Sequence, residues 1–169
     1  MRASPTGHCS RRSAPVRSEE PTNDDCDFPV SKVQADARSL PFVGGSFVAV
    51  VCSLGDAYNC RELWRELSRV LAVEGLCCYT SPTFEWANAY RGEIESTALD
   101  KARFELVDGS IVDVDSEILT MSKQIEVAKA AGLKLLATTE IGVEQLTGKV
   151  SPKLLGSETI VIGYLFSRE

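Results

Sequence analysis

An aspartate follows a short apolar run near the start of the chain, where its carboxylate could accept hydrogen bonds from a ligand. The run is Val30–Ala35, the aspartate is Asp36, and an apolar loop with Leu40 and Phe42 comes next. If the run forms a strand, Asp36 lies at its carboxyl end, the edge at which open α/β sheets bind ligands. Aspartate is also common in turns that end strands, so the residue could simply cap a turn. The pattern alone leaves both interpretations open.

A second group of candidate residues stands at the end of a longer apolar run. Phe47–Ser53 is nearly continuous in apolar and β-branched residues, which is typical of a parallel strand covered on both faces. Ser53 and Leu54 would then lie at the carboxyl end of this strand, beside the ligand-binding edge. The pair Gly44-Gly45 marks the turn that leads into the strand.

A strongly periodic helix follows this run. Its apolar residues recur at helical spacing, and charged residues take the other face. Asn59 stands where the N-cap is expected, with Glu62 three residues on in a capping-box position. The helix ends before Gly75, and Leu76–Thr80 is the next strand. Strand, helix and strand form a βαβ crossover, which predicts an α/β domain with a mostly parallel sheet.

The second half of the chain changes pattern. Asp108-Gly109 between two apolar runs predicts a β-hairpin, and Gly132 stands where a helix end is expected. Two closing strands are expected to pair as an antiparallel hairpin at one edge of the sheet. The elements predicted in this half are helices over Phe84–Glu95 and Ile125–Ala131, hairpin strands over Arg103–Val107 and Ile111–Val114, and closing strands over Leu133–Thr139 and Thr159–Phe166.

Histidine- and metal-dependent chemistry is not indicated by the sequence. The single histidine, His8, lies in the N-terminal segment, which counts against hydrolase sites that need a catalytic histidine. None of the six cysteines forms a Cys-x-x-Cys pair, so neither a zinc site nor a redox motif is predicted. Several cysteines stand in apolar runs, and we interpret them as buried free thiols in a reducing compartment.

Composition and charge restrict the class of protein further. Residues 1–28 carry almost no aliphatic side chains, so we expect a disordered leader before one α/β domain over residues 29–169. The net charge is −6, and residues 1–18 hold four arginines and no acid, so the domain is more acidic still. An acidic domain is not expected to bind nucleic acid. Without a long apolar run, we expect a cytoplasmic protein that is not bound to a membrane.

Three motifs carry a resemblance to a known family. They are Val33-Gln-Ala-Asp-Ala-Arg-Ser-Leu-Pro-Phe, Gly45-Ser-Phe-Val-Ala-Val-Val, and Glu66-Leu-Ser-Arg-Val-Leu with the later Gly75. Together they resemble class I S-adenosylmethionine-dependent methyltransferases of the small-molecule, type 11-like kind. The resemblance implies a partial Rossmann-like methyltransferase sheet. It also implies an enzyme that transfers a methyl group from S-adenosylmethionine to a small-molecule acceptor.

The resemblance implies cofactor contacts but assigns no catalytic residue and no metal. Asp36 would accept a hydrogen bond from the adenine amino group, and the main-chain amide of Ala37 would meet the adenine ring. The two apolar loop residues would pack near the ring, and the residues that end the second strand would lie near methionine and substrate. The six implied contact residues are Asp36, Ala37, Leu40, Phe42, Ser53 and Leu54.

The chain departs from the family pattern before Asp36. The family has a glycine-rich strand-loop that approaches the methionine part of the cofactor, and a second strand that ends in a ribose-binding acid. Residues 1–29 show neither. The sequence therefore looks like an N-terminally truncated methyltransferase. The alternative is a non-catalytic, truncated or degenerate domain with little cofactor binding on its own. The strand over Val30–Ala35 would then form an exposed sheet edge, which predicts self-association.

Overall fold

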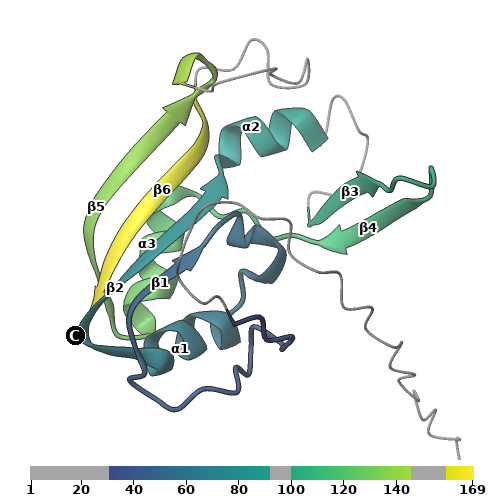
Figure 1. The fold of residues 1–169 in the computed structure, drawn as a ribbon. Helices are drawn as coiled ribbons and strands as arrows, with labels where there is room; N and C mark the ends of the chain where they lie inside the picture. The colour runs from purple at the N-terminus through teal and green to yellow at the C-terminus, as the bar shows by residue number, and fades with distance from the viewer. Residues whose placement is uncertain (1–30, 92–99, 146–158) are drawn as a thin grey trace, which may run out of the picture. The chain divides into compact units, whose positions relative to one another are not determined.

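Figure 1 shows the computed structural model of the chain, which describes residues 31–91, 100–145 and 159–169. The chain divides into two units, residues 1–33 and residues 34–169, and the fold below is that of the second unit. The predicted disordered leader, residues 1–28, lies outside the described residues. Among the described residues, no helix is long and apolar enough to cross a membrane.

A four-stranded sheet organises the second unit (Figure 1). In spatial order its strands are β1 (Phe47–Cys52), β2 (Leu71–Pro82), β6 (Thr159–Arg168) and β5 (Leu133–Gly142). β1 and β2 pair in parallel, whereas β6 runs antiparallel to both of its neighbours. β1, β2 and β5 therefore point the same way and β6 runs against them. This confirms the mostly parallel sheet with an antiparallel C-terminal hairpin at one edge.

Two helices pack on one face of this sheet. α1 (Arg61–Val70) connects β1 to β2, and α3 (Met121–Ala130) precedes β5. Side chains from both helices and from the middle strands meet in one core, in which Trp64, Tyr79 and Phe166 are fully buried. The ring centroid of Trp64 lies 4.7 Å from that of Tyr79 and 5.6 Å from that of Phe166. These contacts join α1 to β2 and β6.

The remaining elements lie around the ends of the sheet strands. A two-stranded hairpin confirms the prediction made from Asp108-Gly109, and Gly109 has the positive φ of 79° that favours glycine. α3 ends before Gly132, as predicted. The other predicted helix is shorter among the described residues, and its last part falls in residues 92–99, outside them. The bounds are η1 (Gly55–Tyr58), α2 (Phe84–Ala89), β3 (Lys101–Glu105), β4 (Ile111–Asp115) and η3 (Val143–Gln145).

The strand predicted over Val30–Ala35 is wrong in the part that the structure describes. Residues 31–35 form no strand, and Asp36 bridges to Ser39 in a tight turn. The run has apolar residues at its first, fourth and sixth positions, so a strand here would not place them on one face. Val33 is accordingly 54% exposed.

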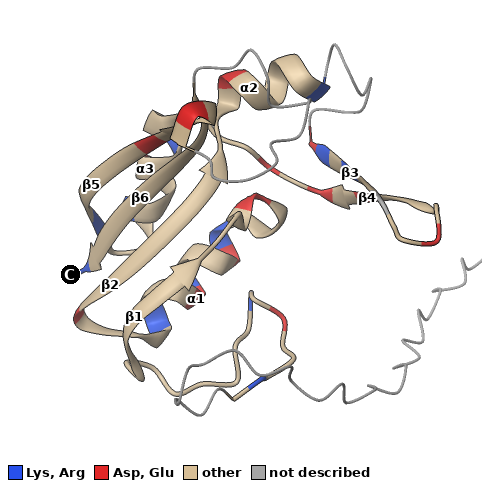
Figure 2. Cartoon of the chain, turned by 45° about the horizontal axis from the view of Figure 1, so that its top comes forward, with Lys and Arg blue, Asp and Glu red and all other residues tan. Residues whose placement is uncertain are grey.

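The described sheet has two edge strands, β5, which carries Lys134 and Glu140, and β1. The other side of β1 pairs with no strand of the described chain, and Val48 and Val51 are 80% and 72% exposed. Figure 2 shows few charged residues on the strands of the sheet, and none of the six residues of β1 is charged. An edge without charged side chains is open to pairing with another chain. Self-association through an exposed sheet edge stays a prediction, and β1 is the edge to which it now applies.

Asn59 is not the N-cap of α1, contrary to the sequence prediction. The N-cap is Cys60, and no side chain caps the helix. The amide of Asn59 donates to Oε1 of Gln124 at 2.8 Å and to the main-chain oxygen of Glu117 at 2.9 Å. Its Oδ1 accepts from Nε1 of Trp64 at 2.8 Å. Asn59 therefore joins α1 to α3 inside the core instead of capping a helix.

Candidate functional site

The carboxyl end of β1 holds a strained residue at the edge where α/β sheets bind ligands. Leu54 has φ 50° and ψ 55°, a left-handed conformation that costs a non-glycine residue about 1–2 kcal/mol. Its main-chain N–H donates to Oγ1 of Thr80 at 2.9 Å, which holds the conformation from β2. Strained residues of this kind cluster at ligand sites. Ser53 and Leu54 thus follow the strand end as the sequence predicted.

The next residue, Gly55, packs against the core. A Cβ atom there would lie 2.3 Å from Cε2 of Tyr79 and 2.7 Å from Sγ of Cys52, so the backbone rests directly on these side chains. The hydroxyl of Tyr79 is buried without a hydrogen-bond partner among the described residues. Burial raises the pKa of Tyr79, so the phenol is neutral at physiological pH. The buried ring of Tyr79 therefore restricts the position of the loop that carries Leu54.

Asp36 is held in its own turn by Arg38. Oδ1 of Asp36 accepts from the main-chain N–H and from Nε of Arg38 at 2.9 and 3.0 Å, and Oδ2 accepts from Nη2 at 2.8 Å. These bonds raise the pKa of the Arg38 guanidinium. The side chain of Asp36 is 44% exposed, and each carboxylate oxygen has more than one lone pair. The carboxylate therefore caps a turn and is in part open to solvent.

The loop that contains Leu40 and Phe42 is held against α1 by hydrogen bonds to Glu66 and Arg69, which also form an ion pair with each other. Arg69 donates to Oε2 and Oε1 of Glu66 at 2.8 and 2.6 Å, and to the main-chain oxygens of Phe42 and Leu40 at 2.8 and 3.1 Å. Oε1 of Glu66 also accepts from the N–H of Leu40 at 2.6 Å. Leu40 and Phe42 are half-buried, and Ala37 packs against the core. Two side chains of α1 thus set the position of the loop.

Replacing Glu66 by Gln is expected to weaken the pH dependence of stability. The hydrogen bonds from Arg69 hold the pKa of Glu66 below its ordinary value of 4.5, and the N–H of Leu40 adds to this. A carboxyl group whose pKa is lowered by folding stabilises the fold above its unfolded pKa, and this stabilisation is lost as the pH falls through the folded pKa. Below pH 4.5 the free energy of unfolding should therefore fall more steeply for the wild-type chain than for Glu66→Gln.

Urea unfolding, followed by tryptophan fluorescence between about pH 3 and pH 7, measures this difference. Arg69→Gln is the matched variant, because it removes the donor and should flatten the profile in the same way. Wild-type and Glu66→Gln profiles that run parallel over the whole range would contradict the assignment.

A cavity of about 470 Å³ opens beside η1, lined by Arg38 from the turn and by Asp56 from η1. Oδ2 of Asp56 accepts from the hydroxyl of Ser116 at 2.6 Å, and Nη2 of Arg91 donates to the same hydroxyl at 2.6 Å. Nη2 of Arg91 lies 4.0 Å from Oδ2 of Asp56. Arg91 and Ser116 are 6% and 1% exposed. Asp56, Arg91 and Ser116 therefore form a cluster of polar groups beside η1, the element that follows the loop at the end of β1.

The sequence did not indicate that Asp56, Arg91 and Ser116 form a cluster. Its members come from η1, from the residues just after α2 and from the segment after β4, and the bond from Ser116 to Asp56 spans 60 residues. No spacing within one element connects them, so no local pattern could have found them. None of the six predicted contact residues is among the described residues that line the cavity. Arg38 links the two regions, because it binds Asp36 and also lines the cavity.

The described cysteines are free thiols, as interpreted from the sequence. The interpretation that they are buried holds for Cys77 and not for the other three, which are partly exposed. Cys52 lies in the site region, and burial raises the pKa of its thiol. Burial also raises the pKa of Cys77 to about 12. Both groups are protonated at neutral pH, and a thiol in that state is a poor nucleophile. Neither thiol is therefore a candidate for covalent catalysis.

No protein-family model and no curated protein matches the sequence of this chain. Its structure is similar to solved S-adenosylmethionine-dependent methyltransferases. The one from Methanosarcina mazei has a TM-score of 0.58 at 13% identity, over 79% of this chain and 65% of that chain. Those from Mesorhizobium loti and Clostridium acetobutylicum have TM-scores of 0.53 at 13% and 12% identity. They match 79% and 80% of this chain and 68% and 63% of their own.

The chain thus spans about two thirds of the length of these solved structures, at 65%, 68% and 63%. At such low identity the similarity establishes the fold and not the activity. The sheet is consistent with this fold, because β1, β2 and β5 run in one direction and β6 runs antiparallel to its two neighbours. The described part of the chain has the Rossmann-like fold of class I S-adenosylmethionine-dependent methyltransferases.

Proposed function

We propose that this chain transfers a methyl group from S-adenosylmethionine to a small-molecule acceptor. The observation that carries the proposal is the fold, which is similar to that of solved S-adenosylmethionine-dependent methyltransferases. The strained Leu54 supports a ligand site at the carboxyl end of β1. Bound S-adenosylmethionine would supply an activated methyl group, so positioning of donor and acceptor can provide much of the catalysis.

The described residues fit the adenine part of this cofactor. Asp36 presents an exposed carboxylate that can accept a hydrogen bond from an amino group. Leu40 and Phe42 present apolar side chains on a loop that α1 holds in place. Ser53 and Leu54 follow the end of β1, where we propose that the methionine part and the acceptor meet. We assign no residue as a catalytic acid or base.

The second candidate is a non-catalytic domain that binds little cofactor on its own. The engagement of Asp36 favours it, because Arg38 already donates to both carboxylate oxygens. An adenine amino group would have to share those oxygens with a charged donor, and hydrogen bonds from charged donors are the stronger ones.

Calorimetric titration with S-adenosylmethionine separates the two candidates. We expect binding, and about a tenfold loss of affinity in Asp36→Ala, because a hydrogen bond to a charged acceptor contributes about 1.5 kcal/mol. Glu126→Ala, an exposed acid on α3, is the control for the change in charge and should bind as the wild type does. Absence of heat at millimolar ligand would contradict methyl transfer by this chain alone and would favour the non-catalytic domain.

A further inference from the structure

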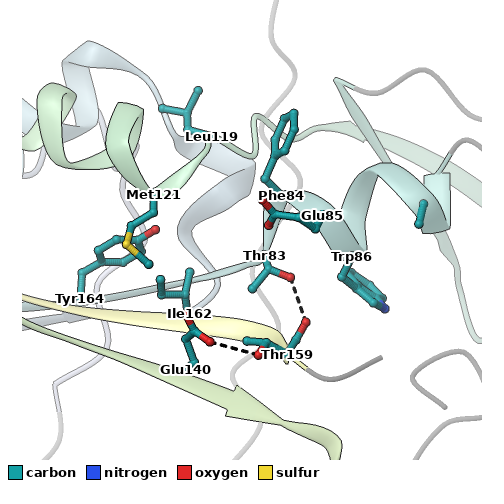
Figure 3. A pocket seen from close by; sticks show the side chains of 11 residues that line it. Thr83, Phe84, Glu85, Trp86, Leu119, Met121, Glu140, Thr159, Ile162 and Tyr164 are labelled. Carbon is teal, nitrogen blue, oxygen red and sulfur yellow. Dashed lines mark hydrogen bonds between the residues drawn. The ribbon is translucent and has the colours of Figure 1, made fainter. Parts of the chain in front are cut away.

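A second cavity has a volume of about 540 Å³ (Figure 3). It lies at the carboxyl ends of β2 and β5, on the side of the sheet away from the edge strand β1. It opens at the junction of β2 and α2, beside the start of α3, the end of β5 and the beginning of β6. Its volume is within the range of small-molecule sites. None of the residues discussed at the end of β1 lines it, so it is separate from the site proposed above. The lining residues come from Thr83 and α2, from α3 and the segment before it, and from the two strands β5 and β6.

The charged groups of this cavity are acidic. Glu85 and Glu140 line it, and the described lining residues include no Lys, Arg or His. Figure 3 shows Glu85 beside Phe84 on one side, and Glu140 below, where its Oε2 accepts from the hydroxyl of Thr159 at 3.2 Å. The hydroxyl of Thr159 is thus already used, and neither carboxylate is neutralised by a base among the described lining residues. Such a cavity attracts a cation and repels a carboxylate or a phosphate.

The other walls are apolar and aromatic. Phe84, Trp86 and Met121 line the cavity, and the indole of Trp86 stacks on the ring of Tyr90 with centroids 5.1 Å apart. Figure 3 shows Tyr164 and Met121 on the side opposite Glu85. Aromatic faces attract ammonium groups, and their apolar area binds the hydrocarbon part of a ligand.

One polar group in the lining has no partner within the described chain. Tyr164 is 1% exposed, and its hydroxyl makes no hydrogen bond to a described residue. A buried hydroxyl without a partner is costly, so it is a group that a ligand can satisfy. Burial and the charge of Glu85 raise the pKa of Tyr164 to about 12, so the phenol is neutral and can accept a hydrogen bond from an ammonium N–H.

We propose that this cavity binds a small organic cation, an ammonium group carried on an apolar or aromatic body. The ammonium lies between the carboxylates of Glu85 and Glu140, and the body packs against Phe84 and Met121. The proposal concerns binding alone and does not depend on the proposed methyl transfer.

Titration followed by amide ¹H–¹⁵N NMR, with the full chain and no cofactor, tests this proposal. The probes are phenethylamine, 2-phenylethanol and 3-phenylpropionate, which share a phenyl body and differ in charge. We expect shifts at the residues that line the cavity and an affinity for phenethylamine about five- to tenfold higher than for 2-phenylethanol. The anionic probe is expected not to bind.

The double variant Glu85→Gln/Glu140→Gln is expected to lose this preference while its binding of 2-phenylethanol is unchanged. Each single variant should weaken phenethylamine binding by about two- to fivefold, because both side chains remain open to solvent. Glu74→Gln/Glu126→Gln changes the net charge equally at exposed positions outside the cavity and should bind as the wild type does. The amide spectrum of each variant reports whether it is folded.

Three results would overturn the proposal. One is an affinity for the alcohol equal to that for the amine. Another is unchanged binding of the amine in the Glu85→Gln/Glu140→Gln variant. The third is the absence of shifts at the lining residues with all three probes. Each result is independent of the titration with S-adenosylmethionine, so failure of one proposal can be told from failure of the other.

Discussion

Replacing Asn59 by Leu is expected to lower the free energy of unfolding by about 3–4 kcal/mol. Asn59 accepts from the indole N–H of Trp64 and donates to Gln124 and to the main-chain oxygen of Glu117. Trp64 and Gln124 are both 0% exposed, so water cannot replace the lost partner. The substitution leaves an indole N–H and an amide oxygen buried and unpaired. Each such group costs about 1–3 kcal/mol.

Urea unfolding followed by circular dichroism measures the loss. Ser122→Ala, at the exposed start of α3, is the control and should change the free energy of unfolding by less than about 0.5 kcal/mol. Asn59→Asp keeps an acceptor for Trp64 and loses the donor to Gln124 and Glu117. A loss below about 1 kcal/mol in Asn59→Leu would show that this network is not what joins α1 to α3.

Asn59 also shows how far the local sequence pattern can be trusted. An asparagine with a glutamate three residues later satisfies the rule for a helix N-terminus, and the predicted helix does begin within two residues of it. The partners of its side chain could not be predicted from this rule. The hydrogen bond to Gln124 spans 65 residues and exists only because α1 and α3 pack on the same face of the sheet. Periodicity within one helix does not encode that contact.

The elements that the sequence predicted correctly are those with a complete local signal. α1 combines apolar periodicity with a charged face, and the β3–β4 hairpin has Asp108-Gly109 between two β-rich runs. The run Val30–Ala35 lacked a single apolar face and forms no strand over its described residues. Strand formation also needs a neighbour to pair with, and the described chain offers none there.

The candidate site likewise contains residues that a local pattern could place and contacts that it could not. Ser53 and Leu54 lie at a strand end because strand direction alone places them there. The pairing of Asp36 with Arg38 is local, but the sequence gives no sign that Arg38 reaches the cavity beside η1. Glu66 and Arg69 stand at helical i,i+3 spacing, but no local pattern indicates that the pair holds the loop with Leu40 and Phe42 in place. Contacts of this kind depend on the packed structure.

A Gly55→Ala variant is expected to lose about 2–3 kcal/mol of stability together with the proposed ligand site. The new Cβ would lie 2.3 Å from Cε2 of Tyr79, closer than atoms of this kind approach. Tyr79 cannot yield, because it is fully buried and its ring centroid lies 4.7 Å from that of Trp64 and 6.2 Å from that of Tyr164. The loop must therefore move away from the core.

Movement of this loop would break the hydrogen bond from Leu54 to Thr80, the bond that holds the strained conformation at the end of β1. On the proposed function, the affinity for S-adenosylmethionine should fall with it, which calorimetry measures beside urea unfolding. Gly109→Ala is the matched control. Its positive φ of 79° makes it costly to the hairpin, but nothing lies within 4 Å of its Cβ, so the cofactor affinity should not change.

Combining Gly55→Ala with Tyr79→Leu makes the clash itself testable. Tyr79→Leu alone should destabilise the core, because it removes the ring that packs on Trp64. It also removes the atom that the new Cβ would meet, so the double variant should lose less stability than the sum of the two single variants, by at least about 1 kcal/mol. Strictly additive losses would mean that the loop does not rest on Tyr79. The strain at Leu54 would then need another origin.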